Sequence, residues 1–190
     1  MWWMENLREN VIKPSDFPQF QRFVIPLVDD VKKVPENENL VKSYSLDHKA
    51  TAVREGGRII LTPEIIYEEK GLEYPCINQD YRFKKHSFTY VSGTINENWF
   101  RNKICKVNSE TKELVQYKEN DYVFPGEPVF IARPKAKEED DGVIVSAMTD
   151  VRDGHQDFLL FLDKDLQEMA RATFQNQIPY ALHGIFMQDC

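Results

Sequence analysis

The sequence predicts an all-β fold assembled from repeated sheets, and three observations lead to this prediction. Short β-rich runs alternate with clusters of turn-forming residues through most of the chain. Two of these runs flank the Gly56-Gly57 pair, a pattern that is typical of a β-hairpin. The same order of four runs then occurs twice, at an offset of about 54 to 56 residues.

Composition narrows the class of protein. A chain of 190 residues with 42% hydrophobic and 29% charged residues fits one globular domain with a sizeable core. The net charge of −7 argues against nucleic acid as a partner, because phosphate binding requires a basic surface. The three cysteines are odd in number and widely spaced, which predicts reduced thiols in the cytoplasm and no zinc site. No secretory signal or membrane-spanning run is present in the sequence.

The first third of the chain has one clear element. Residues 1–35 are a poorly patterned lead-in, because four prolines prevent a long helix. Within them, residues 23–27 are predicted to form a short strand. Residues 50–54 and 58–62 are the two arms of the predicted hairpin.

Two four-stranded units are predicted next, followed by a single strand. The first unit covers residues 73–122, with strands expected at 73–78, 86–91, 103–107 and 114–117. The second covers residues 127–176, with strands expected at 127–131, 142–148, 157–162 and 170–174. Residues 178–190 are expected to form a closing strand.

The repeat places three polar residues at equivalent positions. Overlaying the units aligns Glu73 with Glu127, and one further step reaches His183. Four strands at this period are the signature of a β-propeller blade, whose first strand lines the central channel. The three side chains would then face one axis, where a histidine oriented by carboxylates resembles a metal site. The ordinary alternatives are solvated glutamates and a satisfied core histidine.

Several stretches resemble the C-terminal part of the carotenoid cleavage oxygenases, a family that includes β-carotene oxygenases and retinoid isomerohydrolases. Their order and spacing also match, from about residue 23 to the end. The stretches are EYPCIN at 73–78, FPGEPVF at 124–130, AKEEDDGVIVS at 136–146, FLLFLD at 158–163, EMARA at 168–172 and IPYALHG at 178–184.

The resemblance implies a seven-bladed propeller that binds Fe(II) through four histidines, three of them oriented by glutamates. Residue by residue, His183 matches the last iron ligand, and Glu73 and Glu127 match two of the orienting glutamates. The implied reaction uses O2 to cleave a polyene double bond of a carotenoid or apocarotenoid into two aldehydes or ketones. A lipophilic substrate of this kind favours peripheral membrane contact of the full-length protein.

The sequence departs from the family in length. The half that carries the other three histidine ligands is missing, and His48, His86 and His155 do not match them. Two blade-like units cannot close a propeller, which needs about four to eight blades. We therefore expect a truncated form that binds iron weakly. A non-catalytic partial propeller that binds a partner chain, and a member of the isomerohydrolase type, are the alternatives. The acidic run at 138–141 is expected to cap a turn, not to bind calcium.

Overall fold

The computed structural model describes residues 18–44, 48–94, 102–180 and 183–187. The chain is divided into two compact units. The smaller unit is Gln19–Glu68, and the larger unit contains the described residues from Glu69 onward. Apart from two single-turn 3-10 helices, η1 (Val31–Lys33) and η2 (Gln79–Tyr81), every regular element is a strand. The all-β prediction is therefore confirmed. In the described ranges no helix has the length and apolar character needed to cross a membrane.

The smaller unit contains the predicted hairpin. Strand β2 (Thr51–Glu55) pairs with β3 (Arg58–Thr62) around a turn in which Gly56 has a φ of 60°. Strand β1 (Gln19–Arg22) pairs with β4 (Glu64–Lys70), whose last two residues already belong to the larger unit.

The strand predicted at 23–27 is wrong, because the strand lies just before it, at β1. Pro26 cannot donate a hydrogen bond to a neighbouring strand, which weakens pairing of this segment. Phe23, Ile25 and Leu27 are instead exposed.

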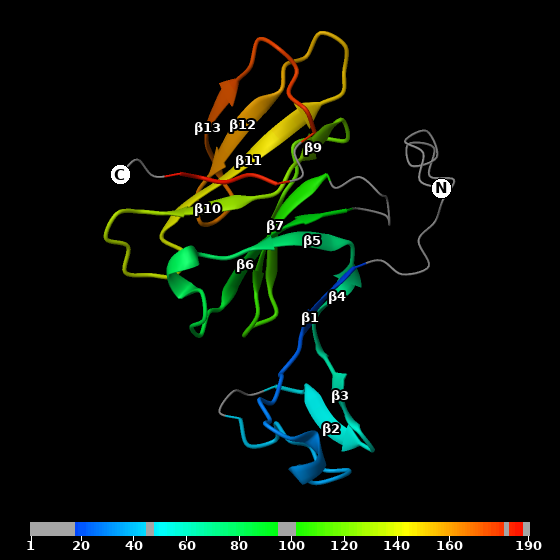
Figure 1. The fold of residues 1–190 in the computed structure, drawn as a ribbon. Coiled ribbons are helices and arrows are strands. Elements are labelled where there is room, and N and C mark those ends of the chain that lie inside the picture. The colour runs from blue at the N-terminus through cyan, green and yellow to red at the C-terminus, as the bar shows by residue number, and fades with distance from the viewer. Residues whose placement is uncertain (1–17, 45–47, 95–101, 181–182, 188–190) are drawn as a thin grey trace. The chain divides into compact units, whose positions relative to one another are not determined.

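The larger unit holds two meandering sheets (Figure 1). In the first sheet the strands follow one another in chain order, each antiparallel to the next. They are β5 (Leu72–Cys76), β6 (Phe88–Gly93), β7 (Lys103–Asn108) and β8 (Leu114–Tyr117).

The second sheet repeats this order and adds a short strand. Its strands are β10 (Val129–Ala132), β11 (Gly142–Asp150), β12 (Phe158–Leu162) and β13 (Glu168–Thr173). Strand β9 (Val123–Pro125) pairs with the end of β11. The four-stranded order in each sheet is that of a propeller blade.

Backbone pairing reproduces the repeat that the sequence predicts. In the first sheet Cys76 pairs with Tyr90, and in the second Phe130 pairs with Ile144, at an offset of 54 residues in both partners. Ser92 and Ser146 are also 54 residues apart, and each pairs with a buried aliphatic residue. The two sheets are therefore equivalent in register as well as in strand order.

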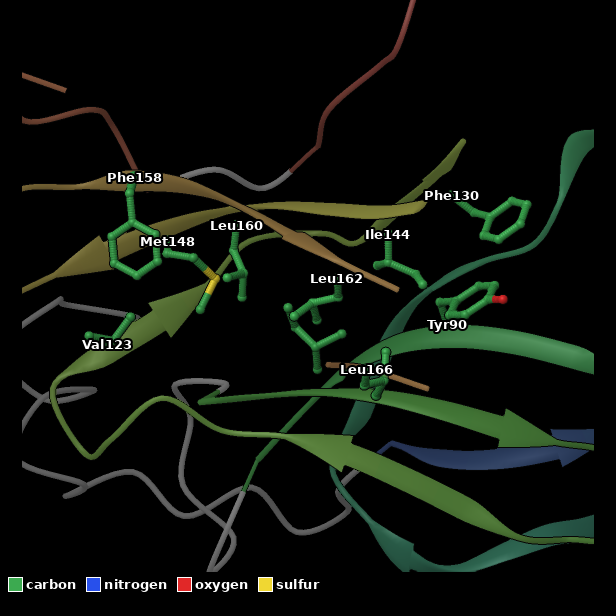
Figure 2. Close-up of a cluster of buried hydrophobic side chains, with 10 residues drawn as sticks. Tyr90, Val123, Phe130, Ile144, Met148, Phe158, Leu160, Leu162 and Leu166 are labelled. Atoms are coloured by element: carbon green, nitrogen blue, oxygen red, sulfur yellow. The ribbon is translucent and has the colours of Figure 1, made fainter. Parts of the chain in front are cut away.

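The two sheets share one hydrophobic core. Along β11 and β12 buried residues alternate strictly with half-buried ones, so one face of the second sheet is turned inward. Figure 2 shows Tyr90 of the first sheet beside Phe130 of the second, with ring centroids 5.0 Å apart and an interplanar angle of 11°. The core comprises Tyr90, Ile104, Val123, Phe130, Ile144, Met148, Phe158, Leu160, Leu162 and Leu166.

Two carboxylates of the acidic run join the second sheet to the first. The Glu139 carboxylate accepts hydrogen bonds from the backbone N–H groups of Ser87, at 2.8 Å, and Phe88, at 2.6 Å. The Asp140 carboxylate pairs with Lys106 of β7, with Nζ and Oδ2 2.7 Å apart. The run does form a turn before β11, as expected, but Glu139 and Asp140, here called the clasp, act mainly between sheets.

The closing strand predicted at 178–190 is wrong for the residues that the structure describes. Residues 178–180 and 183–187 are extended chain without strand pairing. A strand forms only where a neighbouring strand pairs with its backbone groups, and in the described part of the chain no strand pairs with this segment. Side-chain contacts fix its course instead.

Candidate metal centre

The peptide before Glu127 is anchored by the two equivalent serines. The Gly126 carbonyl accepts hydrogen bonds from Ser92 Oγ at 2.6 Å and from Ser146 Oγ at 3.3 Å. The Gly126 N–H donates to the Ala147 carbonyl at 2.8 Å. Because both serines are buried, Glu127 emerges from a rigid point between the sheets. Sequence reasoning missed these serines, although the repeat places them at equivalent positions.

Glu127 holds His183, so the structure brings two of the three predicted site residues together. Oε2 of Glu127 lies 3.1 Å from His183 Nδ1 and accepts the Gly184 N–H at 3.2 Å. An ionised carboxylate only accepts hydrogen bonds, so His183 donates from Nδ1, and in the neutral ring the lone pair is then on Nε2. The Glu127 side chain is 19% exposed and that of His183 is 73% exposed. The imidazole is thus oriented on one side and open on the other.

Tyr74 also contacts the histidine ring. Its ring meets the His183 ring edge-on, with centroids 5.4 Å apart and an interplanar angle of 79°. Strand β5 is bulged between Glu73 and Cys76, and Tyr74 has a φ of 53°, which is uncommon for a bulky residue. Strained backbone of this kind is concentrated at functional sites. The signal in the sequence was Pro75, since proline within a strand often marks a bulge.

Glu73 lies on β5 directly before this bulge. It is half-buried and pairs with Ser92 across the sheet. Its role in orienting a ligand histidine stays a prediction. The first strands of the two sheets, β5 and β10, are joined nearby by a hydrogen bond, in which the Phe130 N–H donates to Cys76 Sγ at 3.5 Å. Burial raises the pKa of the Cys76 thiol, and the negative charge of Glu127 acts in the same direction.

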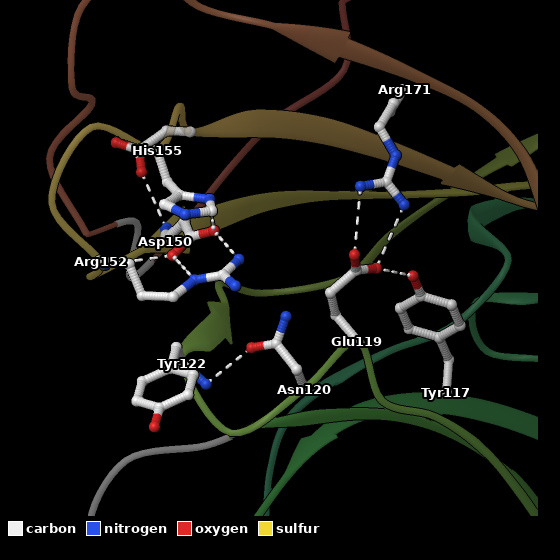
Figure 3. A network of polar contacts seen from close by, with 9 residues as sticks. Tyr117, Glu119, Asn120, Tyr122, Asp150, Arg152, His155 and Arg171 are labelled. Carbon is white, nitrogen blue, oxygen red and sulfur yellow. Dashed lines mark hydrogen bonds and ion pairs between the residues drawn. The ribbon is translucent and has the colours of Figure 1, made fainter.

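The other histidines contact their own local segments. His155 lies in the turn between β11 and β12, and its Nδ1 is 3.4 Å from Asp150 Oδ2. Figure 3 shows the His155 ring beside Arg152, which contacts the same carboxylate. Hydrogen bonds from Arg152 hold the pKa of Asp150 below its usual value. His86 Nδ1 is 3.1 Å from the Lys84 carbonyl, and His48 Nδ1 is 3.1 Å from the Ala50 carbonyl. Within the described ranges no three histidine, cysteine, aspartate or glutamate side chains gather as a metal-binding group.

Removing the Glu127 carboxylate is expected to change the tautomer of His183. In Glu127→Ala the Nδ1 proton loses its acceptor, and the ring should revert to the Nε2–H form that free histidine prefers. We expect the Nδ1–H fraction to fall, with its ratio to the Nε2–H fraction lower by a factor of about five, corresponding to one hydrogen bond of about 1 kcal/mol. Long-range 15N–1H NMR spectra of the imidazole measure this fraction. Glu138→Ala, at an exposed glutamate, is the control, and an unchanged tautomer in Glu127→Ala would contradict the assignment.

The fold and the site together define a class of protein. It is an all-β protein of blade-like sheets, in which a glutamate holds a histidine beside the first strands of the two sheets. The model of the family described as retinal pigment epithelial membrane protein matches residues 2–188. The chain therefore belongs to this family, which is the carotenoid oxygenase family that its motifs resemble.

Curated relatives in the family are carotene dioxygenases. The chain is 35% identical over 196 residues to human β,β-carotene 15,15'-dioxygenase, a match that covers all of this chain and 34% of the relative. It is 38% identical over 177 residues to the Gallus gallus enzyme of the same name, covering 92% of this chain and 32% of the relative. The chain thus spans about a third of the length of these relatives.

Solved structures share the fold. A mutant of Synechocystis apocarotenoid oxygenase matches with a TM-score of 0.63 at 24% identity, covering 68% of this chain and 28% of that one. A chimera of this oxygenase with RPE65 matches with a TM-score of 0.63 at 25% identity and the same coverage. The predicted fold class, blades of a larger propeller, is confirmed by these likenesses.

Proposed function

We propose that this chain is the C-terminal part of a non-haem Fe(II) dioxygenase that cleaves a polyene double bond of a carotenoid or apocarotenoid with O2. The observation that carries the proposal is the contact between His183 Nδ1 and Glu127 in a member of this family. The names of the curated relatives support the substrate class. His183 is proposed as the last of four histidine ligands, the other three lying outside the stretch seen here.

The residues present fit one position of such a metal site. A ligand histidine normally donates its second ring N–H to a carboxylate, which fixes the tautomer and raises the basicity of the ring. His183 meets this description, because Glu127 accepts at Nδ1 and Nε2 of this largely exposed side chain is left for the metal. A neutral imidazole is a ligand type that suits iron.

Each residue of the site then has a defined task. Fe(II), when bound, supplies the activation of O2 for double-bond cleavage. Glu127 orients the His183 ring, keeps its proton on Nδ1 and offsets part of the cation's charge. Tyr74 limits rotation of the ring from the side. Glu73 is proposed to orient a second ligand histidine in the same way.

The proposed carotenoid substrate also has a consequence for where the full-length protein is located in the cell. Because such polyenes partition into lipid, we propose peripheral membrane contact for the full-length protein. The odd number and wide spacing of the cysteines support a cytoplasmic location.

A chimera tests the proposed function. The matching third of the human dioxygenase is replaced by this chain, and β,β-carotene cleavage and bound iron are measured. We expect cleavage with one iron per chain. His183→Ala should lower kcat/KM at least 100-fold and reduce the iron content. Glu127→Gln should lower activity about 10- to 100-fold, the usual effect of losing a carboxylate partner of a metal ligand.

The control is His86→Ala, which removes a histidine from a turn and should leave activity and iron content unchanged. A folded chimera in which His183→Ala retains full iron and activity would refute the ligand assignment. A folded chimera without iron would favour the non-catalytic partner, and isomerisation of a retinoid without cleavage would favour the isomerohydrolase type.

A further inference from the structure

Asp157 is a buried carboxylate that joins the end of β11 and the chain after β13 to the start of β12. It lies directly before β12 and is 1% exposed. Its Oδ1 accepts the N–H of Asp150, the last residue of β11, at 2.9 Å. Its Oδ2 accepts the N–H of Ile178 at 2.7 Å, and its own carbonyl accepts the N–H of Phe174 at 2.9 Å. The chain that leaves β13 is therefore fastened twice to one residue.

A carboxylate buried to this degree has to be compensated by hydrogen bonds. Backbone N–H groups donating to an ionised carboxylate form short, strong bonds, and the two distances at Asp157 are of that kind. The fixed point therefore lies on the side chain of Asp157, and both β11 and the closing segment are held to it.

The fastening lies a short distance upstream of His183. Ile178 carries the last N–H before Pro179, which has none and keeps Ile178 extended. His183 is the fifth residue after Ile178, so it can lie at most about 18 Å beyond the fixed point at about 3.6 Å per residue. In the described residues of this segment no strand pairing limits its course, so the Asp157 anchor, together with the Tyr180 hydroxyl that donates to the Pro125 carbonyl at 3.4 Å, sets where the histidine reaches.

We infer that Asp157 is a positioning residue for His183: it fastens the closing segment at Ile178 so that the imidazole arrives between Glu127 and Tyr74. The importance of this placement rests on the proposed function, in which His183 binds the metal. A purely structural role would confine Asp157 to the turn between β11 and β12, with no effect on the histidine.

NMR spectroscopy of this 190-residue chain without metal separates these roles. In Asp157→Ala we expect exchange of the Ile178 amide to accelerate at least tenfold and the nuclear Overhauser contact between the Tyr74 and His183 rings to disappear. Amides of β6 and β7 should keep their exchange rates within twofold. Asp157→Asn retains one acceptor oxygen, so its effects on the Ile178 exchange rate and on the contact between the rings should be intermediate. This variant replaces Asp157→Ala in the test if the alanine variant does not fold.

The matched control is Asp163→Ala, because the Asp163 carboxylate also accepts two backbone N–H groups, from Asp165 and Gln167, within the turn before β13. It should leave the contact between the rings intact. The inference is overturned if Asp157→Ala, or Asp157→Asn in its place, keeps that contact at full intensity. Because the measurement uses no iron, absence of activity in the chimera would count against the proposed function alone.

Discussion

Leu160→Ala is expected to lower the free energy of unfolding by about 3 to 5 kcal/mol, the upper range for truncating a buried leucine. Leu160 lies in the middle of β12, is fully buried and belongs to the core between the two sheets. Alanine would leave a cavity lined by residues of both sheets, which strand pairing prevents from collapsing. Denaturant unfolding followed by far-UV circular dichroism measures the change.

Leu159→Ala provides the matched control for this substitution. Leu159 is the preceding residue of the same strand, but it points to the opposite face and is only half-buried. Its truncation should cost about 1 kcal/mol or less, because little of the side chain loses contact. Equal losses in the two variants would mean that the core does not lie on the Leu160 face of the sheet.

Asp140→Ala is expected to lower the free energy of unfolding by about 2 to 4 kcal/mol. Asp140 forms an ion pair with Lys106 that is largely buried: the Lys106 side chain is 8% exposed and the Asp140 side chain 16%. Removing the Asp140 carboxylate leaves the Lys106 ammonium group without its counter-charge. The free-energy cost of this unpaired charge exceeds the stabilisation that the intact pair provides. The Lys164 carbonyl, 2.8 Å from Nζ, and the Phe88 ring, 4.2 Å away, offset only part of this cost.

Two further variants make this prediction specific. Asp141→Ala removes the neighbouring carboxylate, whose partner Arg133 is 68% exposed, and should cost about 1 kcal/mol or less. The double variant Lys106→Met with Asp140→Leu removes both charges and should recover at least half of the loss. If Asp140→Ala were as mild as Asp141→Ala, the pair of Asp140 with Lys106 would contribute no more than a surface ion pair.

Strands with strong local signals were predictable from the sequence. β8 was predicted at 114–117, its observed bounds, and the hairpin of β2 and β3 was placed within one residue at each end. β4 was missed because glutamates and a lysine obscure its alternation of buried and exposed residues. β9 was missed because it has only three residues and ends in proline. In both, pairing with a strand distant in the sequence outweighs local preference.

Part of the candidate site was predictable in the same way. Glu127 and His183 follow from a blade-length repeat, because equivalent positions in successive blades lie near one another. Tyr74 and Asp157 could not be predicted, since their importance depends on a backbone bulge and on a segment that returns from beyond β13. Pro75 indicates the bulge, but these are tertiary contacts, and no local sequence pattern records which residues they bring together.

The clasp has a consequence for how this protein can vary over evolutionary time. Glu139 binds backbone N–H groups, so its recognition of position 87 does not depend on which side chain is present there. Any residue but proline, which lacks the N–H, can occupy that position without loss of the contact. An insertion or deletion at the start of β6, where residues 87 and 88 supply the two N–H groups, would instead displace the donors. Natural variation at this junction should therefore change residue identity freely while conserving chain length.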